Sequence, residues 1–158
     1  MEGGCTCGNV RYRLNGKPLI VHACHCTWCQ RETGTAHALN ALYEAERVEH
    51  LKAEPEMVPT PSASGKGQRV ARCPLCKVAI WSNYPQAGPA VRFVRVGTMD
   101  EPGRYRPDIH IFTSTKLPWV TLGPDEKTVP EFYSLDEVWS DEAKERRRIM
   151  RERAASKK

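Results

Sequence analysis

Short runs that alternate apolar and polar residues are the main pattern along the first 125 positions. Residues Val91–Val96 come close to a period of two, which is typical of a half-buried strand. Glycine and proline separate the runs, as at Gly16 and Pro18. Many short strands divided by turns predict a mainly β fold. The strands that we expect are Val10–Leu14, Leu19–His22, Ala36–Tyr43, Arg69–Cys73, Val78–Ser82, Val91–Val96, Ile109–Thr113 and Trp119–Leu122.

One internal segment lacks this pattern. Residues Glu54–Gly67 are rich in proline, serine and glycine and poor in large apolar side chains. This composition is typical of a loop. We therefore predict a loop within one domain rather than a domain boundary, and a length of 158 residues is consistent with a single domain that has its own core.

The C-terminal residues change to a helical pattern. Ser140 is a typical N-cap, and the acidic Asp141 and Glu142 suit the first turn of a helix. Strong helix formers continue to Ala155 with almost no apolar stripe, so we expect a solvated helix that frays into a disordered end. The predicted organisation is a β domain over residues 1–139 and a charged helical tail over residues 140–158.

Positive charge is concentrated in this tail. The chain has a net charge of +5, and residues 141–158 contain eight basic and four acidic residues, which is +4 of that total. Attraction to a polyanion would therefore come from the tail alone. The sequence has no apolar run of membrane-spanning length, and its N-terminal residues lack the basic and apolar regions of a secretory signal. These features predict a cytoplasmic protein, with a nuclear location left open, and no membrane partner.

All seven cysteines fall into three short clusters. In a reducing compartment thiols stay free, react or bind metal, and an odd number leaves one unpaired in any full disulfide scheme. Two cysteines one residue apart bridge each other poorly, but they can present two thiolates to one metal ion. The clusters are Cys5 and Cys7; Cys24, Cys26 and Cys29; and Cys73 and Cys76.

Seven thiols provide one complete set of four ligands and three more. Zinc prefers four ligands in a tetrahedron, and thiolates favour zinc over hard ions. The turn with Cys73 and Cys76 needs a second pair to close a site, and Cys5 and Cys7 form the only other isolated pair. These four cysteines are predicted to hold a structural zinc whose binding free energy is part of folding.

The remaining triplet is predicted to be a catalytic zinc site. Cys24, Cys26 and Cys29 would present three thiolates from one tight loop. A zinc ion with three protein ligands keeps a fourth position for water or substrate. It can lower the pKa of bound water, or bind a substrate thiol as thiolate. We therefore expect two zinc ions per chain.

Three other interpretations of the cysteines stay open. They could be buried structural residues without metal, or the triplet could hold an iron–sulfur cluster. Both zinc sites could also be structural, with a histidine as the fourth ligand of the triplet. His25 lies between two ligands and should point away from them. The candidate histidines are His22, His25, His37 and His110.

Longer motifs surround the cysteines, and they are Gly3–Tyr12, Cys24–Gly34, Arg72–Cys76, Pro107–Phe112 and Pro118–Trp119. In these segments, in the same order over residues 3–123, the chain resembles the family of glutathione-dependent formaldehyde-activating enzymes, which includes the centromere protein V group. The combined cysteine pattern is specific to that family. Lys77 is a departure, because family members commonly have glycine there. The turn must then avoid a left-handed backbone or accept strain.

The resemblance implies a β-tent fold for the zinc-binding domain, with short antiparallel strands clamped by a four-cysteine zinc, and a second zinc on the triplet. It also implies the addition of glutathione to formaldehyde, which gives S-hydroxymethylglutathione. Because the reverse step breaks a C–S bond, this activity is classed with the carbon–sulfur lyases. The matching positions are Cys5, Cys7, Cys73 and Cys76 for the structural metal, and Cys24, Cys26 and Cys29 for the catalytic metal.

Two further residues are candidates for the catalytic site. Arg31 follows the triplet and could receive a substrate carboxylate with bidentate geometry, or it could form a structural salt bridge near Glu32. His110 could act as a general acid or base, because its unperturbed pKa lies near neutrality, or it could be a half-buried strand residue.

Two classes of function follow. The first is a zinc-dependent carbon–sulfur lyase-type enzyme acting on a small thiol adduct of glutathione and an aldehyde, or a zinc lyase or dehydratase with another small-molecule substrate in specialised metabolism. The second is a non-catalytic, zinc-stabilised binding module whose basic tail, with Arg146, Arg147 and Arg148, contacts nucleic-acid phosphates or a cytoskeletal partner. Water or an exchangeable thiol as the fourth triplet ligand would favour the enzyme, and a histidine would favour the module. An oligomer is compatible with either class.

Overall fold

The computed structural model describes residues 1–156 and is built mainly from short strands. The strands are β1 (Glu2–Gly4), β2 (Arg11–Leu14), β3 (Ile20–Cys24), β4 (Ala38–Glu44), β5 (Val48–His50), β6 (Glu56–Thr60), β7 (Gln68–Arg72), β8 (Ala79–Asn83), β9 (Val91–Arg95) and β10 (Ile109–Ile111). The helices are α1 (Thr27–Thr33), α2 (Leu135–Val138) and α3 (Asp141–Ala155), with 3₁₀ turns η1 (Ala45–Arg47), η2 (Val96–Thr98), η3 (Pro102–Arg104) and η4 (Thr113–Thr115). The mainly β prediction is confirmed.

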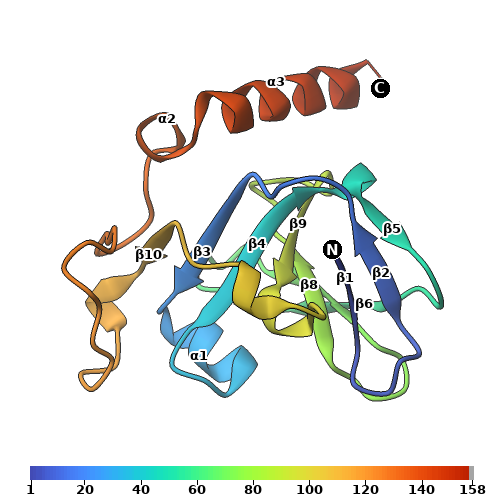
Figure 1. Ribbon diagram of the computed structural model, residues 1–158, viewed down its shortest axis with the longest axis horizontal. Coiled ribbons are helices and arrows are strands. Elements are labelled where there is room, and N and C mark those ends of the chain that lie inside the picture. Colours follow the sequence, from blue (N-terminus) through green and yellow to red (C-terminus); the bar gives the residue numbers. More distant parts are fainter. Residues whose placement is uncertain (157–158) are drawn as a thin grey trace.

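The strands form two sheets in the described part of the chain. The smaller sheet has the order β1-β2-β5, and the larger has the order β10-β3-β4-β9-β8-β7-β6. Neighbouring strands are antiparallel except β10 and β3, which are parallel. Figure 1 shows the smaller sheet on one side of the molecule and α3 running across its top.

The larger sheet separates two hydrophobic cores. On β4, Ala41 faces the first core together with Tyr12 and Val94, and the smaller sheet covers this face. The next residue, Leu42, faces the second core, where Tyr133 and the segment leading into α3 cover the sheet. Successive residues of a strand point to opposite faces, so β4 is apolar on both sides.

Seven of the eight predicted strands overlap an observed strand, and the eighth was wrong. Trp119–Leu122 forms a turn and irregular chain in place of a strand, and Trp119 is 70% exposed. Among the described residues this apolar run pairs with no strand of either sheet. The predicted loop Glu54–Gly67 also needs correction, because it contains β6, paired with β7. Pro59 lies inside β6, and proline is tolerated there because β6 is an edge strand.

The C-terminal helix begins as predicted. The Ser140 side chain accepts a hydrogen bond from Ala143 N at 3.2 Å, and α3 runs on to Ala155. The predicted disordered end falls at residues 157–158, outside the described residues. Within residues 1–156, no helix combines the length and apolar character needed to cross a membrane.

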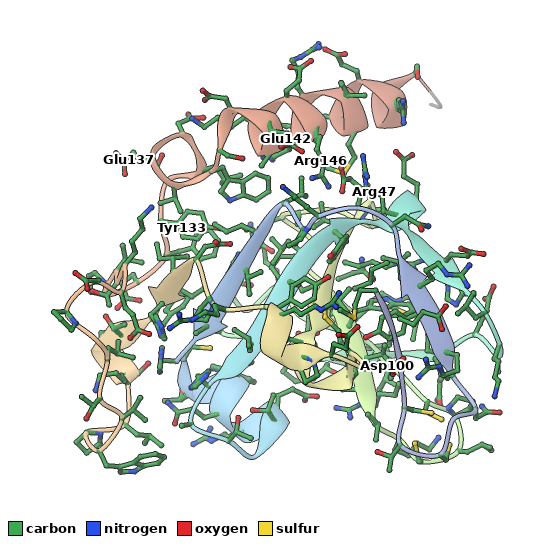
Figure 2. All side chains as sticks on the ribbon, in the orientation of Figure 1. Arg47, Asp100, Tyr133, Glu137, Glu142 and Arg146 are labelled. Atoms are coloured by element: carbon green, nitrogen blue, oxygen red, sulfur yellow. The ribbon has the colours of Figure 1, made fainter. Side chains whose placement is uncertain are left out.

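The helix also contacts the body, which its polar sequence did not predict. Arg146 donates to both carboxylate oxygens of Glu44, at 2.8 and 2.7 Å, and to Lys17 O at 2.9 Å. Figure 2 shows Arg146 pointing from α3 toward the body, next to Arg47. Farther along the helix, Arg153 pairs with Glu46 at 2.8 Å. One face of α3 is therefore held by ion pairs in addition to apolar contacts, because Ala143 is buried in the second core and Met150 packs against it.

Candidate metal centres

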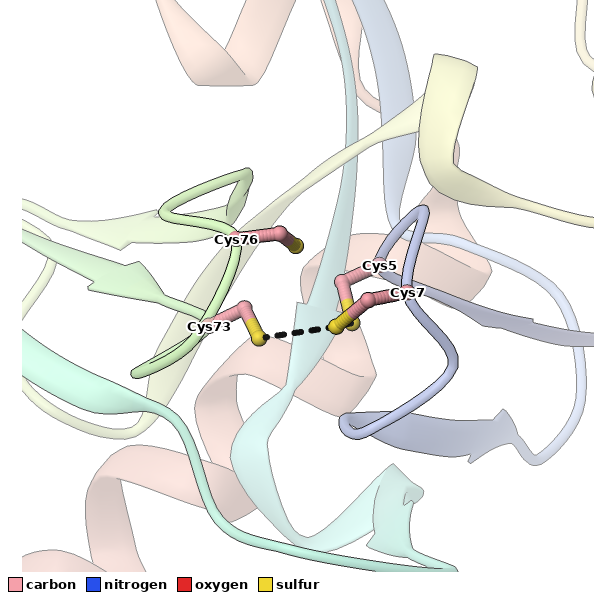
Figure 3. A group of neighbouring side chains, drawn as sticks. All are labelled: Cys5, Cys7, Cys73 and Cys76. Carbon is pink, nitrogen blue, oxygen red and sulfur yellow. Dashed lines mark hydrogen bonds between the residues drawn. The ribbon is translucent and has the colours of Figure 1, made fainter.

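The first group of thiols joins two parts of the chain that are far apart in sequence. Cys5 and Cys7 lie between β1 and β2, and Cys73 and Cys76 lie in the turn between β7 and β8. Figure 3 shows the four side chains converging from these two loops. Their sulfur atoms all lie within 4.8 Å of one another, with 3.5 Å between Cys5 and Cys7 and 3.7 Å between Cys7 and Cys73.

This spacing fits a tetrahedral metal ion. Four sulfurs at about 2.3 Å from zinc would lie about 3.8 Å from one another. Backbone groups support the thiolate form: burial raises the pKa of Cys73, but the N–H groups of Cys76 and Leu75 help to lower it to about 6. Val10 N donates to Cys5 Sγ at 3.3 Å. These four cysteines could therefore hold a metal ion.

The turn after Cys76 has a strained backbone, which was one of the two alternatives that we expected for Lys77. Lys77 has a φ of +60°, in the left-handed region, and its N–H donates to Cys73 O at 3.0 Å. Its ammonium pairs with Glu56 at 3.0 Å. A lysine at such a φ carries a steric cost that a glycine would not.

The second group forms where β3 passes into α1, not in a single tight loop. Cys24 is the last residue of β3, Cys26 caps α1, and Cys29 lies in the first turn of that helix. Their sulfur atoms also lie within 4.8 Å of one another. Cys29 N donates to Cys26 Sγ at 3.3 Å, so the capping role that serine often fills is taken here by a thiol.

The neighbouring thiols, and then the helix start, favour a thiolate at Cys26. Hydrogen bonds from the Cys24 and Cys29 thiols, together with the backbone N–H groups of Cys29 and Trp28, lower the pKa of Cys26 to about 2. A helix N-terminus stabilises negative charge, and the thiolate is the form that binds metal. In the described part of the chain, no histidine or carboxylate joins the triplet within 4.8 Å. The triplet could therefore hold a metal ion with one position left open.

None of the four candidate histidines reaches the triplet in this arrangement. His22 Nε2 lies 3.0 Å from the Tyr133 hydroxyl. His25 does point away from the thiols, and its Nε2 lies 2.9 Å from His110 Nδ1. The ring of His37 lies 4.9 Å from that of His25. Three of the four histidines thus form a cluster of their own, in which His25 and His110 are buried and His37 is half-buried.

The sheet register explains the position of His110. On β10, Ile111 pairs with Cys24 and His110 pairs with Ala23. Paired residues share a face, so the His110 ring lies on the face opposite to that of Cys24. Burial lowers the pKa of His110 below its ordinary value, although nearby Glu126 raises it. His110 is therefore next to His25 rather than next to the thiols.

Arg31 lies on the exposed side of α1. Over residues 1–156 its side chain makes no hydrogen bond and no ion pair. Its neighbour Glu32 pairs instead with Arg72. The guanidinium of Arg31 is thus available at the end of the helix that carries Cys29.

Sequence reasoning missed several polar residues on the face that carries Cys24. Arg95 is buried, and it donates to Asn40 Oδ1 at 2.7 Å and to Ser82 Oγ at 3.3 Å. Burial raises the pKa of Tyr84, whose ring lies 4.8 Å from that of Phe93, two residues before Arg95 on β9. One signal was present: Arg95 falls in phase with the inward-facing Val91 on a predicted alternating strand.

Comparisons with known proteins identify the family of this chain. No protein with a curated description matches the chain. Among solved structures it is similar to a crystal structure of a Rhodobacter sphaeroides protein, with 17% identity and a TM-score of 0.48, over 63% of this chain and 88% of that one. A family model described as glutathione-dependent formaldehyde-activating enzyme matches residues 1–115, which include all seven cysteines. The chain therefore belongs to the glutathione-dependent formaldehyde-activating enzyme family.

Proposed function

We propose that this chain is a zinc-dependent enzyme of the carbon–sulfur lyase type that acts on a small thiol adduct, such as that of glutathione and an aldehyde. The observation that carries the proposal is the triplet of Cys24, Cys26 and Cys29, which converges without a fourth protein ligand among residues 1–156. Three protein ligands and one open position are typical of catalytic zinc. Membership of the family favours the same class of reaction.

The donor sets suit two zinc ions with different tasks. Thiolates are soft ligands that select zinc over magnesium or calcium. The four-cysteine group would hold a structural ion. At the triplet, a bound zinc would supply an open position where a substrate thiol is held as thiolate.

The reaction itself is balanced without an oxidant or a reductant. A sulfur–carbon bond forms between the thiol and the carbonyl carbon of the aldehyde. The electron pair of the C=O π bond moves to oxygen, and this oxygen takes up the proton that the thiol has lost. In the reverse direction the hydroxyl loses its proton and the C–S bond breaks. The protein therefore contributes mainly by positioning the two partners and stabilising charge.

Residues on and beside α1 would hold the rest of the substrate. Arg31 lies two residues after Cys29 on α1 and is exposed, and we assign it the binding of a substrate carboxylate. Trp28 is 40% exposed next to the same thiols and offers an apolar wall. His110 reaches the triplet only through His25, so we assign it a positioning role for the segment between Cys24 and Cys26.

Metal content tests the two-site proposal. We expect two zinc ions per wild-type chain, and one in Cys26→Ser with the fold retained. Cys73→Ser serves as the matched variant in the other group, and it should lose stability because that site links the two loops. One zinc ion in the wild type, unchanged in Cys26→Ser, would overturn the proposal.

Exchange between glutathione and ¹³C-formaldehyde tests the activity. Because the adduct also forms without an enzyme, the rate of exchange must be measured by NMR with and without the zinc-loaded protein. We expect acceleration that Cys26→Ser abolishes and Arg31→Met weakens mainly through KM. Fully loaded protein that leaves the rate unchanged would exclude this adduct, and the same test would then be repeated with other small thiols and aldehydes.

The binding-module alternative is not favoured by the tail. Arg146 is bound to Glu44, Arg148 to Glu145 and Glu152, and Arg153 to Glu46. Pairing with acids reduces the positive charge available to phosphates. The enzyme proposal therefore has the stronger support from this structure.

A further inference from the structure

One buried positive charge has no carboxylate partner. Arg95 is 7% exposed at the end of β9, and its side-chain acceptors, Asn40 Oδ1 and Ser82 Oγ, are neutral. Its Nε is buried without any partner. No carboxylate of residues 1–156 lies within 4.0 Å of it. Because burying an unpaired charge is costly, Arg95 requires a nearby anion.

The other buried charged side chain in the described chain shows the usual solution. Glu44 is 3% exposed, and it is paired with Arg146 at 2.7 Å and with Arg47 at 3.3 Å. Arg95 is therefore an exception within the same fold. The difference indicates a role that a structural ion pair does not explain.

The sheet register places Arg95 on the same face as the triplet. Asn40 pairs with Arg95, and Ala38 pairs with Cys24. Residues 38 and 40 of β4 point to one face, so the Arg95 and Cys24 side chains do so as well. The Arg95 guanidinium contacts Asn40 Oδ1 at 2.7 Å, and Asn40 lies two residues along β4 from Ala38, the partner of Cys24.

We propose that Arg95 is the counter-charge of the triplet centre, and that it makes an anionic thiolate a better fourth ligand than a neutral one. This inference rests on the proposed function. Three thiolates and Zn²⁺ sum to a charge of −1, and a fourth thiolate makes it −2. Arg95 brings that sum back to −1. A neutral ligand leaves the sum unchanged and gains nothing comparable from the guanidinium.

Ligand titration of protein with Co²⁺ in the triplet tests the proposal without using activity. The two probes are 2-mercaptoethanol, a thiol without a carboxylate, and imidazole, a neutral ligand. Thiolate binding is followed by the sulfur-to-cobalt charge-transfer band. We expect Arg95→Met to lower the affinity for 2-mercaptoethanol about 10–100-fold, as is usual for residues that support a metal site. The affinity for imidazole should stay within about 2-fold of the wild-type value.

Three variants separate charge from packing. Arg95→Lys keeps the charge and should recover most of the thiol affinity. Arg95→Gln removes the charge but can still bond to Asn40, so it should behave like Arg95→Met and serves if that variant does not fold. Arg92→Met is the matched control, because Arg92 lies on the same strand and faces the other way, over Trp81. It should leave both affinities unchanged.

The outcomes distinguish the inference from the function on which it rests. A wild-type triplet that binds neither Co²⁺ nor the thiol would overturn the proposed function. If wild type binds the thiol and both Arg95→Met and Arg95→Gln bind it with the wild-type affinity, only the counter-charge role of Arg95 would be overturned. Equal losses for thiol and imidazole would also overturn it, because they would show a structural role.

Discussion

Replacing Arg146 by methionine removes the main partner of a buried carboxylate. The side chains of Glu44 and Arg146 are 5% and 14% exposed, and two hydrogen bonds join them. Breaking a buried pair from one side costs about 3–5 kcal/mol of unfolding free energy. Arg47 remains at 3.3 Å from Glu44 and compensates in part. We therefore expect a loss of about 2–3 kcal/mol, somewhat below that range.

Thermal unfolding of the metal-loaded protein measures this loss. For a chain of this length, 1 kcal/mol corresponds to about 2–4 °C, so Tm should fall by about 5–10 °C. The double variant Glu44→Gln/Arg146→Met should be more stable than Arg146→Met, because it no longer buries an unpaired charge. The change in unfolding free energy of the double variant, minus the sum of the changes in Glu44→Gln and Arg146→Met, gives the coupling energy of the pair.

The pH dependence provides a second check. Burial raises the pKa of Glu44, but Arg146 brings it below its ordinary value of 4.5. The stabilisation is therefore fully present above about pH 4.5 and is lost as the pH falls through the lower, folded-state pKa. The Tm difference between wild type and Arg146→Met should be constant between pH 6 and pH 8. A Tm change below about 1 °C at neutral pH would refute the reasoning, since α3 would then not be held by this pair.

Three further predictions concern the backbone and one buried histidine. Lys77→Gly should raise the free energy of unfolding in urea titrations by about 0.5 kcal/mol, and Lys77→Val should lower it, because a β-branched residue fits a left-handed φ worst. Gly3→Ala should cost about 1–3 kcal/mol in the same assay, because a Cβ would lie 2.5 Å from Thr98 O and overlap the Tyr12 ring; a neutral result would show that the strand can shift. Burial lowers the pKa of His22 to about 3, so the imidazole takes up a proton more readily in the unfolded chain, and the free energy of unfolding should fall by about 1.4 kcal/mol between pH 8 and pH 5.5. His22→Gln should remove this part of the pH dependence in urea titrations. The same pH dependence in wild type and variant would contradict the prediction.

The sequence predicted those parts of the fold that have a local pattern. Val91–Arg95 alternates and is a strand, and Ser140 caps α3. β6 was missed because an edge strand needs little apolar surface and tolerates Pro59. α1 was missed because it is short and begins inside the cysteine motif, where a thiol replaces the usual capping side chain.

The candidate site was predictable to the extent that it depends on spacing. The two cysteine pairs, which are far apart in sequence, come together as one group of four, and the triplet forms a group of its own. The position of Arg95 depends on which strands pair and in which register, and no local pattern contains that information. For His110 the same register matters, because a shift of one residue would have turned its ring to the other face.

The four-cysteine group also acts on the unfolded chain. Cys7 and Cys73 are 66 residues apart in sequence, so a metal ion held between them closes a loop of that length. By analogy with a disulfide, such a cross-link lowers the entropy of the unfolded ensemble by the equivalent of about 4 kcal/mol. On the ribosome, Cys5 and Cys7 emerge long before their partners. The nascent chain must therefore keep two reduced thiols without a complete site until the turn between β7 and β8 has been made.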